Sequence, residues 1–256
     1  MTPIDAILLG IVEGVTEFLP ISSPGHLILA SALLHIAASS FLSSFEIVIQ
    51  LGAILAVAVL YWRAFLDTEV LKRLVVAFIP TGVIGLALYK VVKTYFLGND
   101  SIVLWSLALG GLALILFELW HREHEEATRE VRAISYRQAA FVGFFQSLAI
   151  VPGVSRSAAT IVGGLALGIK RSTIVEFSFL LAVPTMLAAS GLDLIKNASS
   201  FSSGDTLTLV IGFLVAFLVA LLSIRWLLSY VRGHSFVGFG IYRILAALAF
   251  FFFILR

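Results

Sequence analysis

The chain has 256 residues, of which 60% are hydrophobic and 12% are charged, and its formal net charge at pH 7 is +2. Its mean hydropathy of +1.07 lies far above the range of soluble domains, so the composition excludes a soluble globular protein and indicates an integral membrane protein. The absence of cysteine excludes disulfides, thiolate metal sites and a catalytic thiol.

The first apolar segment, residues 4–20, is too short to cross about 30 Å of hydrocarbon, which takes roughly 20 helical residues. A signal peptide is the competing interpretation, but the segment has no basic start, contains three acidic residues and leads to no small-residue cleavage site. The next apolar segment, 25–38, is also short, and Pro20 with a Ser-Pro-Gly cluster separates the two. We therefore predict a re-entrant helical hairpin, whose turn must be buried in protein or line a wet cavity.

Six uninterrupted apolar runs are long enough to cross a membrane. They cover residues 44–62, 74–92, 102–120, 173–195, 206–228 and 235–255. A second pair of short segments, 137–151 and 155–168, surrounds Pro152-Gly153 and predicts a second re-entrant hairpin. The predicted fold class is thus an all-α polytopic membrane protein with six spanning helices and two re-entrant hairpins.

The two halves of the chain repeat the same order of elements. Each half is one hairpin followed by three crossings, so the second half must enter the membrane from the opposite face, and the repeat is inverted. We predict a single integral membrane domain with repeat one at 1–120, a polar cytoplasmic linker at 121–136 and repeat two at 137–256.

The lysines and arginines of the loops predict the orientation, because cytoplasmic loops carry an excess of them. On one side of the predicted membrane lie Arg63, Lys72, Arg73, Arg122, Arg129, Arg132, Arg137, Lys170, Arg171, Arg225 and Arg232, against Lys90, Lys93, Lys196 and Arg256 on the other. We place the richer side in the cytoplasm, so both termini and the first hairpin's mouth face the exterior or periplasm. Because topology accounts for the basic residues, no nucleic-acid partner is predicted.

The first hairpin concentrates acidic groups. Glu13 and Glu17 are four residues apart and share one helix face, while Gly10 and Gly14 leave room for a neighbouring helix. Two carboxylates in apolar surroundings stay ionised only beside a cation; otherwise they share a proton. Mg²⁺ or Ca²⁺, completed by waters and phosphate oxygens, is the cofactor that this pair predicts. The alternative is an ion pair with an arginine that has no chemical role.

The second hairpin concentrates donors for an anion. Ser155, Arg156, Ser157 and Thr160 follow Pro152-Gly153, where a half-helix begins. A helix N-terminus offers unpaired N–H groups and a positive dipole end, and arginine adds a bidentate fork suited to phosphate. The alternative is that Ser155 only caps the helix and Arg156 only balances a glutamate. Capping and phosphate binding can coexist.

His26 follows Ser22 and Ser23 at the first turn. It is a candidate nucleophile on phosphorus or a general acid, and Ser23 is the alternative nucleophile with His26 as its base. A packing role is the plainer alternative. Arg243 lies deep in the last apolar run, where we expect it to face a carboxylate.

Three stretches carry a family resemblance: the E-x-x-x-E of Glu13 and Glu17, residues 18–26 (FLPISSPGH) and residues 152–160 (PGVSRSAAT). The chain resembles the bacitracin-resistance family of undecaprenyl pyrophosphate phosphatases over essentially its whole length. The resemblance implies a multi-pass protein of the bacterial cytoplasmic membrane that removes the terminal phosphate of the C55 isoprenoid diphosphate carrier, regenerating the monophosphate for wall synthesis. It also implies divalent-metal dependence and an active site toward the periplasm. Pro24 replaces the usual Ser or Thr, so no role carries over there.

The predicted site combines both hairpins. The catalytic candidates are His26, Glu17, Glu13 and Ser23, with Glu13 and Glu17 also holding the metal; the substrate-binding candidates are Arg156, Ser155, Ser157, Thr160, Gly153 and Ser22. The lipid tail of the substrate would lie among apolar side chains. The competing class is a transporter or lipid flippase, because inverted repeats with midplane breaks are a transport architecture. Homo-oligomerisation is left open.

Overall fold

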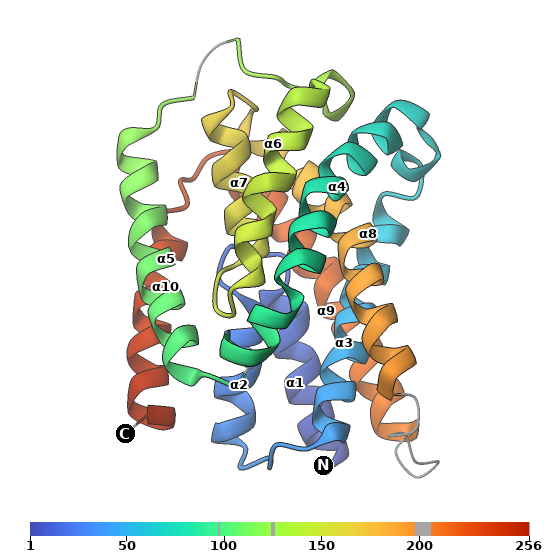
Figure 1. Cartoon of the computed structure of the whole chain (residues 1–256), viewed down its shortest axis with the longest axis vertical. Helices are drawn as coiled ribbons and strands as arrows, with labels where there is room; N and C mark the ends of the chain where they lie inside the picture. Colours follow the sequence, from blue (N-terminus) through green and yellow to red (C-terminus); the bar gives the residue numbers. More distant parts are fainter. Residues whose placement is uncertain (97, 124–125, 198–205, 256) are drawn as a thin grey trace.

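A computed structural model of the chain describes residues 1–96, 98–123, 126–197 and 206–255, and in these ranges it is helical without strands (Figure 1). The α-helices are α1 (Pro3–Thr16), α2 (Ser23–Leu33), α3 (Ser40–Leu60), α4 (Thr68–Val91), α5 (Asp100–Trp120), α6 (Tyr136–Ser147), α7 (Arg156–Ala166), α8 (Arg171–Asn197), α9 (Thr206–Tyr230) and α10 (Val237–Phe250). Arg256, one of the residues used for the orientation, lies outside the described ranges.

Six of these helices are long and apolar enough to span a membrane, as predicted: α3, α4, α5, α8, α9 and α10 with its continuation to Leu255. The starts of α3 and α4 lie before the apolar runs, because polar residues form their first turns. The side chain of Ser39 caps α3, and that of Asp67 caps α4. Hydropathy finds the part of a helix that contacts lipid, whereas the caps decide where the helix begins.

The four remaining helices are short and form two pairs. In Figure 1 the outer ends of α1 and α2 lie near the N-terminus, whereas the outer ends of α6 and α7 lie at the opposite end of the molecule. Capping boxes start α1 at Thr2 and α6 at Ser135. The α1–α2 turn contains Pro20, and the α6–α7 turn contains Pro152, which supplies no backbone N–H. Both turns therefore interrupt the helices where the sequence predicts a break.

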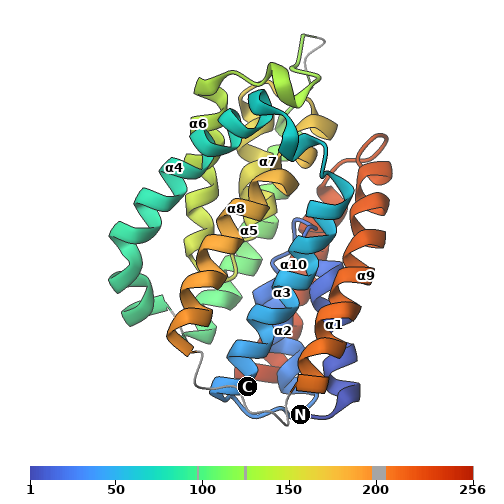
Figure 2. The ribbon, with the colours of Figure 1, turned by 90° about the vertical axis from the view of Figure 1, so that its right-hand side faces the viewer.

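Each pair packs on a spanning helix of the other half. Helix α1 lies along α9, which also packs on α3, and α6 lies along α4 (Figures 1 and 2). A Cβ atom on Gly10 would lie 2.8 Å from the Gly212 carbonyl oxygen, and one on Gly14 would lie 2.7 Å from that of Ala216. The prediction that these glycines admit a neighbouring helix is confirmed, and the neighbour is α9.

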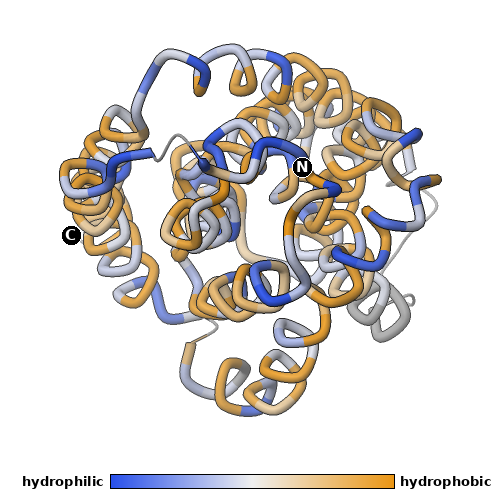
Figure 3. The backbone as a smooth tube through the Cα atoms, turned by 90° about the horizontal axis from the view of Figure 1, so that it is seen from above, coloured by the Kyte–Doolittle hydropathy of each residue, from blue (hydrophilic) through white to orange (hydrophobic). Residues whose placement is uncertain are grey.

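The outer surface is apolar, as lipid contact requires. Seen from above, hydrophobic residues prevail along the helices and hydrophilic ones gather in connections (Figure 3). Leu119 and Leu86 are 74% and 72% exposed. The connection after α5 is hydrogen-bonded to the segment between α7 and α8. The Thr128 N–H donates to the Gly168 carbonyl at 3.0 Å, and the Thr128 carbonyl accepts from Lys170 N–H at 2.9 Å.

Candidate active site

The turns of the two short-helix pairs contact each other inside the bundle. The Ser157 hydroxyl donates to the Leu19 carbonyl at 2.8 Å, and both residues are buried. The ring of Phe18, next to Leu19, meets that of Phe179 edge to face, with the ring centroids 5.3 Å apart. The predicted acidic and anion-binding motifs, which are far apart in the sequence, are therefore brought to one place.

Glu17, Ser23 and Arg156 form the centre of this junction. The Ser23 hydroxyl makes a short hydrogen bond to Glu17 Oε2. On the other side, Arg156 Nη2 donates to Glu17 Oε1 at 3.1 Å, across the junction of the two turns. Arg156 Nη1 donates to the Ser178 carbonyl at 2.9 Å, while its Nε is buried and makes no hydrogen bond. Arg156 thus does balance a glutamate, and it keeps one N–H available for another acceptor.

Glu13 lies one helical turn before Glu17 and is completely buried. Neither carboxylate oxygen has a hydrogen-bond partner. A buried anion without a partner is costly, so this group calls for a proton or a cation. Mg²⁺ commonly uses one or two protein carboxylates and fills its remaining positions with waters and phosphate oxygens. The described residues hold no cluster of three or more His, Asp or Glu side chains, and a metal at Glu13 and Glu17 stays a prediction.

His26 is held between two partners. Its Nδ1 lies 2.8 Å from the Ser22 carbonyl, and its Nε2 lies 3.0 Å from the Tyr242 hydroxyl of α10. Because a carbonyl only accepts, Nδ1 carries the proton in the neutral ring and Nε2 accepts from Tyr242. The two rings lie nearly parallel, with centroids 5.4 Å apart. Ser23 therefore finds Glu17, and not His26, as its hydrogen-bond partner.

Tyr242 was missed by sequence reasoning. Its hydroxyl contacts the candidate histidine, although the side chain is 45% exposed and 216 residues separate the two. The only available signal is its place beside Arg243, the one arginine deep in the last apolar run. A single tyrosine at that position is equally typical of a lipid-facing helix.

Arg243 corrects an expectation. It does not face a carboxylate: its hydrogen bonds go to the backbone carbonyls of Pro20, Gly153, Ser106 and Leu107. The physical reason is that the carbonyls of the two non-helical turns have no helical partner and lie against α10. The side chain is 1% exposed.

Both turns contain a residue with positive φ. Ser22 has φ +74°, a conformation that is costly for a residue with a side chain, and its hydroxyl is buried without a partner. Its carbonyl orients His26. Gly153 has φ +88°, and a Cβ there would lie 2.6 Å from the Val103 carbonyl oxygen of α5. Gly153 therefore permits the turn to lie directly on α5.

The other predicted anion ligands contact protein groups. Ser155 caps α7, with its hydroxyl accepting from Ala158 N–H at 3.2 Å. Ser157 joins the turns, and the Thr160 hydroxyl lies 2.6 Å from that of Ser178. The capping alternative for Ser155 is confirmed, and phosphate binding by these hydroxyls stays a prediction.

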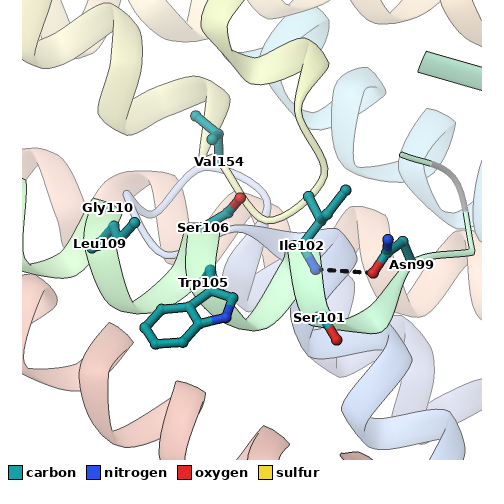
Figure 4. Close-up of a pocket in the computed structure, with 8 residues that line it drawn as sticks. All are labelled: Asn99, Ser101, Ile102, Trp105, Ser106, Leu109, Gly110 and Val154. Carbon is teal, nitrogen blue, oxygen red and sulfur yellow. Dashed lines mark hydrogen bonds between the residues drawn. The ribbon is translucent and has the colours of Figure 1, made fainter. Parts of the chain in front are cut away.

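A cavity of about 400 Å³ lies beside the second turn, on the outer side of α5 (Figure 4). Its wall consists mainly of one helical stripe, with Trp105 and Leu109 among its apolar residues, and Val154 of the turn closes one side. Asn99 caps α5 at the cavity's edge, where its side chain accepts from Ile102 N–H at 3.3 Å. None of the predicted catalytic residues lines this cavity.

Comparison with known families identifies the family of this chain. Residues 6–249 match the family described as bacitracin resistance protein BacA. The chain belongs to this family. The match covers both turns, five of the spanning helices and most of the sixth, and it confirms the resemblance inferred from the three stretches.

Curated relatives agree over nearly the full length. The chain is 53% identical to the undecaprenyl-diphosphatase of Sulfurihydrogenibium sp. (strain YO3AOP1), covering 98% of this chain and 99% of the relative. It is 50% identical to the undecaprenyl-diphosphatase of Aquifex aeolicus (strain VF5), with 98% of both chains covered. It is 49% identical to that of Wolinella succinogenes, with 97% of both covered.

Proposed function

We propose that the chain is an undecaprenyl-diphosphatase, which hydrolyses undecaprenyl diphosphate to undecaprenyl phosphate and inorganic phosphate. This reaction returns the carrier lipid to cell-wall synthesis and confers resistance to bacitracin. BacA family membership and the names of the full-length relatives support it. The single structural observation that carries the chemistry is the contact of Ser23 and Arg156 with the two oxygens of Glu17.

The geometry favours Ser23 as the nucleophile. Its Oγ attacks the terminal phosphorus, its proton passes to Glu17 Oε2, and the bond from that phosphorus to the bridging oxygen breaks, releasing undecaprenyl phosphate. Glu17 passes that proton to the departing undecaprenyl phosphate and becomes a carboxylate again. Water then attacks the phosphoserine and gives its proton to Glu17, the bond from phosphorus to Ser23 Oγ breaks, and Glu17 returns the proton to Oγ, which releases phosphate and restores the Ser23 hydroxyl. Arg156 and the N-terminus of α7 hold the non-bridging oxygens and offset their charge.

His26 remains the alternative nucleophile, because its Nε2 carries a lone pair. The two candidates leave different intermediates. Phosphoserine survives acid, whereas phosphohistidine is acid-labile, so rapid quenching of the enzyme with substrate labelled on the terminal phosphate separates them. Label that is retained in acid and lost in Ser23→Ala supports Ser23. Acid-labile label that is lost in His26→Ala overturns this assignment.

Glu13 and Glu17 are the residues that would hold a divalent cation, Mg²⁺ or Ca²⁺. The two unpartnered oxygens of Glu13 support this proposal. When bound, the ion would neutralise charge on the diphosphate. Removing divalent cations with a chelator should abolish phosphate release, and adding Mg²⁺ should restore it.

We further propose that the two short-helix pairs are re-entrant hairpins of an inverted repeat in the bacterial inner membrane. The reciprocal packing of α1 on α9 and of α6 on α4 supports the repeat. The loop charges support cytoplasmic exposure of the α6–α7 mouth and a site that opens toward the periplasm. In this cysteine-free chain, a cysteine added after the last residue should react with an impermeant thiol reagent from outside. Labelling only from the cytoplasm contradicts the orientation.

The decisive experiment for the activity is phosphate release from undecaprenyl diphosphate by the purified, detergent-solubilised protein. Arg156→Ala and Glu17→Ala should each abolish release while leaving the helix content and the monodisperse elution unchanged. Gly85→Ala is a suitable control, because a Cβ at Gly85 meets nothing within 4 Å. Lipid transport in liposomes without hydrolysis would instead favour the transporter class.

A further inference from the structure

Arg243, on α10, donates hydrogen bonds to both turns of the site. Its Nη1 donates to the Pro20 carbonyl at 3.4 Å in the first turn, and its Nη2 donates to the Gly153 carbonyl at 3.1 Å in the second. Helix α5 supplies two more acceptors, the carbonyls of Ser106 at 3.0 Å and Leu107 at 3.4 Å. One planar group thus connects three segments.

This arrangement depends on a fork of N–H donors. Arg243 uses all three nitrogens: Nη1 donates to the first turn, Nη2 donates to both the second turn and α5, and Nε donates to α5. A lysine ammonium is a compact point charge on a flexible stem and does not reproduce this planar fork. Among the described residues no carboxylate pairs with Arg243, so its charge is solvated by backbone dipoles alone.

Helix α5 is built to admit the guanidinium. A Cβ atom on Gly110 would lie 2.8 Å from Arg243 Cζ, and one on Gly111 would lie 2.9 Å from Arg243 Cβ. Both distances are too short for a real contact. An alanine at Gly110 would displace the guanidinium, whereas one at Gly111 would also meet the Gly240 carbonyl oxygen at 2.7 Å and so displace α10 itself. Arginine and glycines form one interlocking unit between α5 and α10.

We propose that Arg243 is a positioning residue that fixes the first turn relative to the second. The inference rests on the proposed function, because its importance comes from how the reaction is divided between the turns. The groups proposed for attack, Glu17 and Ser23, belong to the first turn, and Arg156 belongs to the second. Only a fixed spacing lets the attacking oxygen face a phosphorus atom that the other turn holds.

This division predicts which kinetic constant changes. The diphosphate in the ground state still meets Arg156 and the α7 N-terminus, which lie together on the second turn, so KM should change less than about threefold. The transition state needs both turns at once, and a misplacement of about 1 Å costs on the order of 100-fold in rate. Arg243→Lys should therefore lower kcat by about 10- to 100-fold.

A second variant moves the arginine without replacing it. Gly110→Ala keeps the charge and every donor but places a methyl group where the guanidinium lies. It should lower kcat in the same way as Arg243→Lys. The matched controls are Gly85→Ala, a helical glycine with open space around it, and Arg171→Lys, a partly buried arginine that pairs with Glu118 elsewhere. At equal amounts of folded protein, both controls should retain the kcat of the unmodified chain.

The spacing itself can be measured by cross-linking, because the chain has no native cysteine. Cysteines at Pro24, which is exposed, and Val154, which is half-buried, report on the two turns. The double-cysteine protein that keeps Arg243 and Gly110 should be cross-linked by thiol reagents of only a narrow range of lengths. When Arg243→Lys or Gly110→Ala is added to this double-cysteine protein, reagents of a broader range of lengths should cross-link it. The two control substitutions should leave the range unchanged.

Three results would overturn the proposal. The first is an unchanged cross-linking range with unchanged kcat in both variants. The second is loss of kcat with an unchanged range, which would mean that Arg243 acts on the substrate directly. The third is aggregation of both variants while Gly85→Ala folds, which would assign the contacts to folding instead of alignment. If the unmodified chain releases no phosphate, the proposed function fails, yet the cross-linking comparison still tests the alignment.

Discussion

The two short-helix pairs differ most clearly at one pair of matching positions. Glu13 stands three residues after Gly10 in the first short-helix pair, and Gln146 stands three residues after Gly143 in the second. Both side chains are buried, but Glu13 has no hydrogen-bond partner, whereas Gln146 Nε2 donates to Thr81 at 3.0 Å and to Thr185 at 3.1 Å. A buried acid without a hydrogen-bond partner therefore corresponds to a buried amide that donates to two hydroxyls.

This difference shows how the similar motifs of the two short-helix pairs can contribute different groups to one site. A buried amide needs only hydrogen-bond partners, which neighbouring helices supply, whereas a buried carboxylate needs a positive charge or a proton. The second turn instead carries Arg156, which reaches across to Glu17. Charge of each sign is thus confined to one turn, and the contact between the turns completes the site.

The largest effect on activity is expected at the ion pair between the two turns. Arg156→Ala removes the proposed N–H donors to the phosphate and leaves Glu17 buried without its ion-pair partner. Phosphate release should fall by about 1,000-fold or more, because an arginine that stabilises a transferring phosphoryl group contributes about that much. Steady-state assays with undecaprenyl diphosphate measure it. Activity within tenfold of the unmodified enzyme would contradict the role of Arg156.

The next largest effect on activity is expected when the acid of α1 is replaced by the amide that α6 carries at the matching position. Glu13→Gln replaces the unpartnered acid by the amide found at the matching position. We expect kcat to fall by about 100-fold, in the range of a lost catalytic carboxylate, and the response to added Mg²⁺ to weaken. The thermal midpoint should stay the same or rise, because a neutral amide is cheaper to bury than an unpaired acid.

A magnesium titration of initial rates, with thermal unfolding on the same preparation, checks both parts of this prediction. If Glu13→Gln kept the affinity for Mg²⁺ and the rate, the cation site would have to be sought elsewhere.

These two predictions concern residues that the sequence itself indicates. The six spanning helices could be predicted because a bilayer fixes the length of an apolar run, and the turns could be predicted because Pro20 and Pro152 interrupt helices. Glu13, Glu17 and Arg156 stand out because charge is rare in such a chain. Their residue types therefore suffice to select them.

The remaining contacts depend on tertiary structure. Nothing local shows that Tyr242 meets His26 from 216 residues away, or that Arg243 binds the Pro20 carbonyl from 223 residues away. Backbone carbonyls have no sequence signature, so a buried arginine suggests a carboxylate partner by default. The positive φ of Ser22 is likewise imposed by packing, since the residue type does not favour it.

A smaller effect is expected at the edge of the first turn. Tyr242→Phe keeps the ring against His26 but removes the hydroxyl that donates to Nε2. One hydrogen bond contributes about 0.5–1.5 kcal/mol, so the rate should fall by about tenfold at most. The double variant with His26→Ala should be no slower than His26→Ala alone, because Tyr242 acts through the histidine. Multiplicative losses would show that the two residues act independently.

The smallest effect on activity is expected for the converse exchange. Gln146→Glu puts an acid into α6, where the Thr81 and Thr185 hydroxyls already donate to the carbonyls of Gly143 and Leu181. Those hydroxyls offer only acceptor oxygens to residue 146, so a carboxylate there loses both hydrogen bonds. The variant should be destabilised by about 1–3 kcal/mol.

Its kcat per folded molecule should nevertheless stay within about threefold of the unmodified enzyme, because Gln146 contacts none of Glu17, Ser23 and Arg156. Thermal unfolding and phosphate release, normalised to the monodisperse fraction, separate these two quantities. Gln138 offers the control: it is another glutamine of α6, and Gln138→Glu keeps its capping box but loses the hydrogen bond from Nε2 to the Leu167 carbonyl, far from the junction of the turns. A large loss of kcat in Gln146→Glu would mean that the second turn also takes part in the chemistry, and the division of charge between the turns would be incomplete.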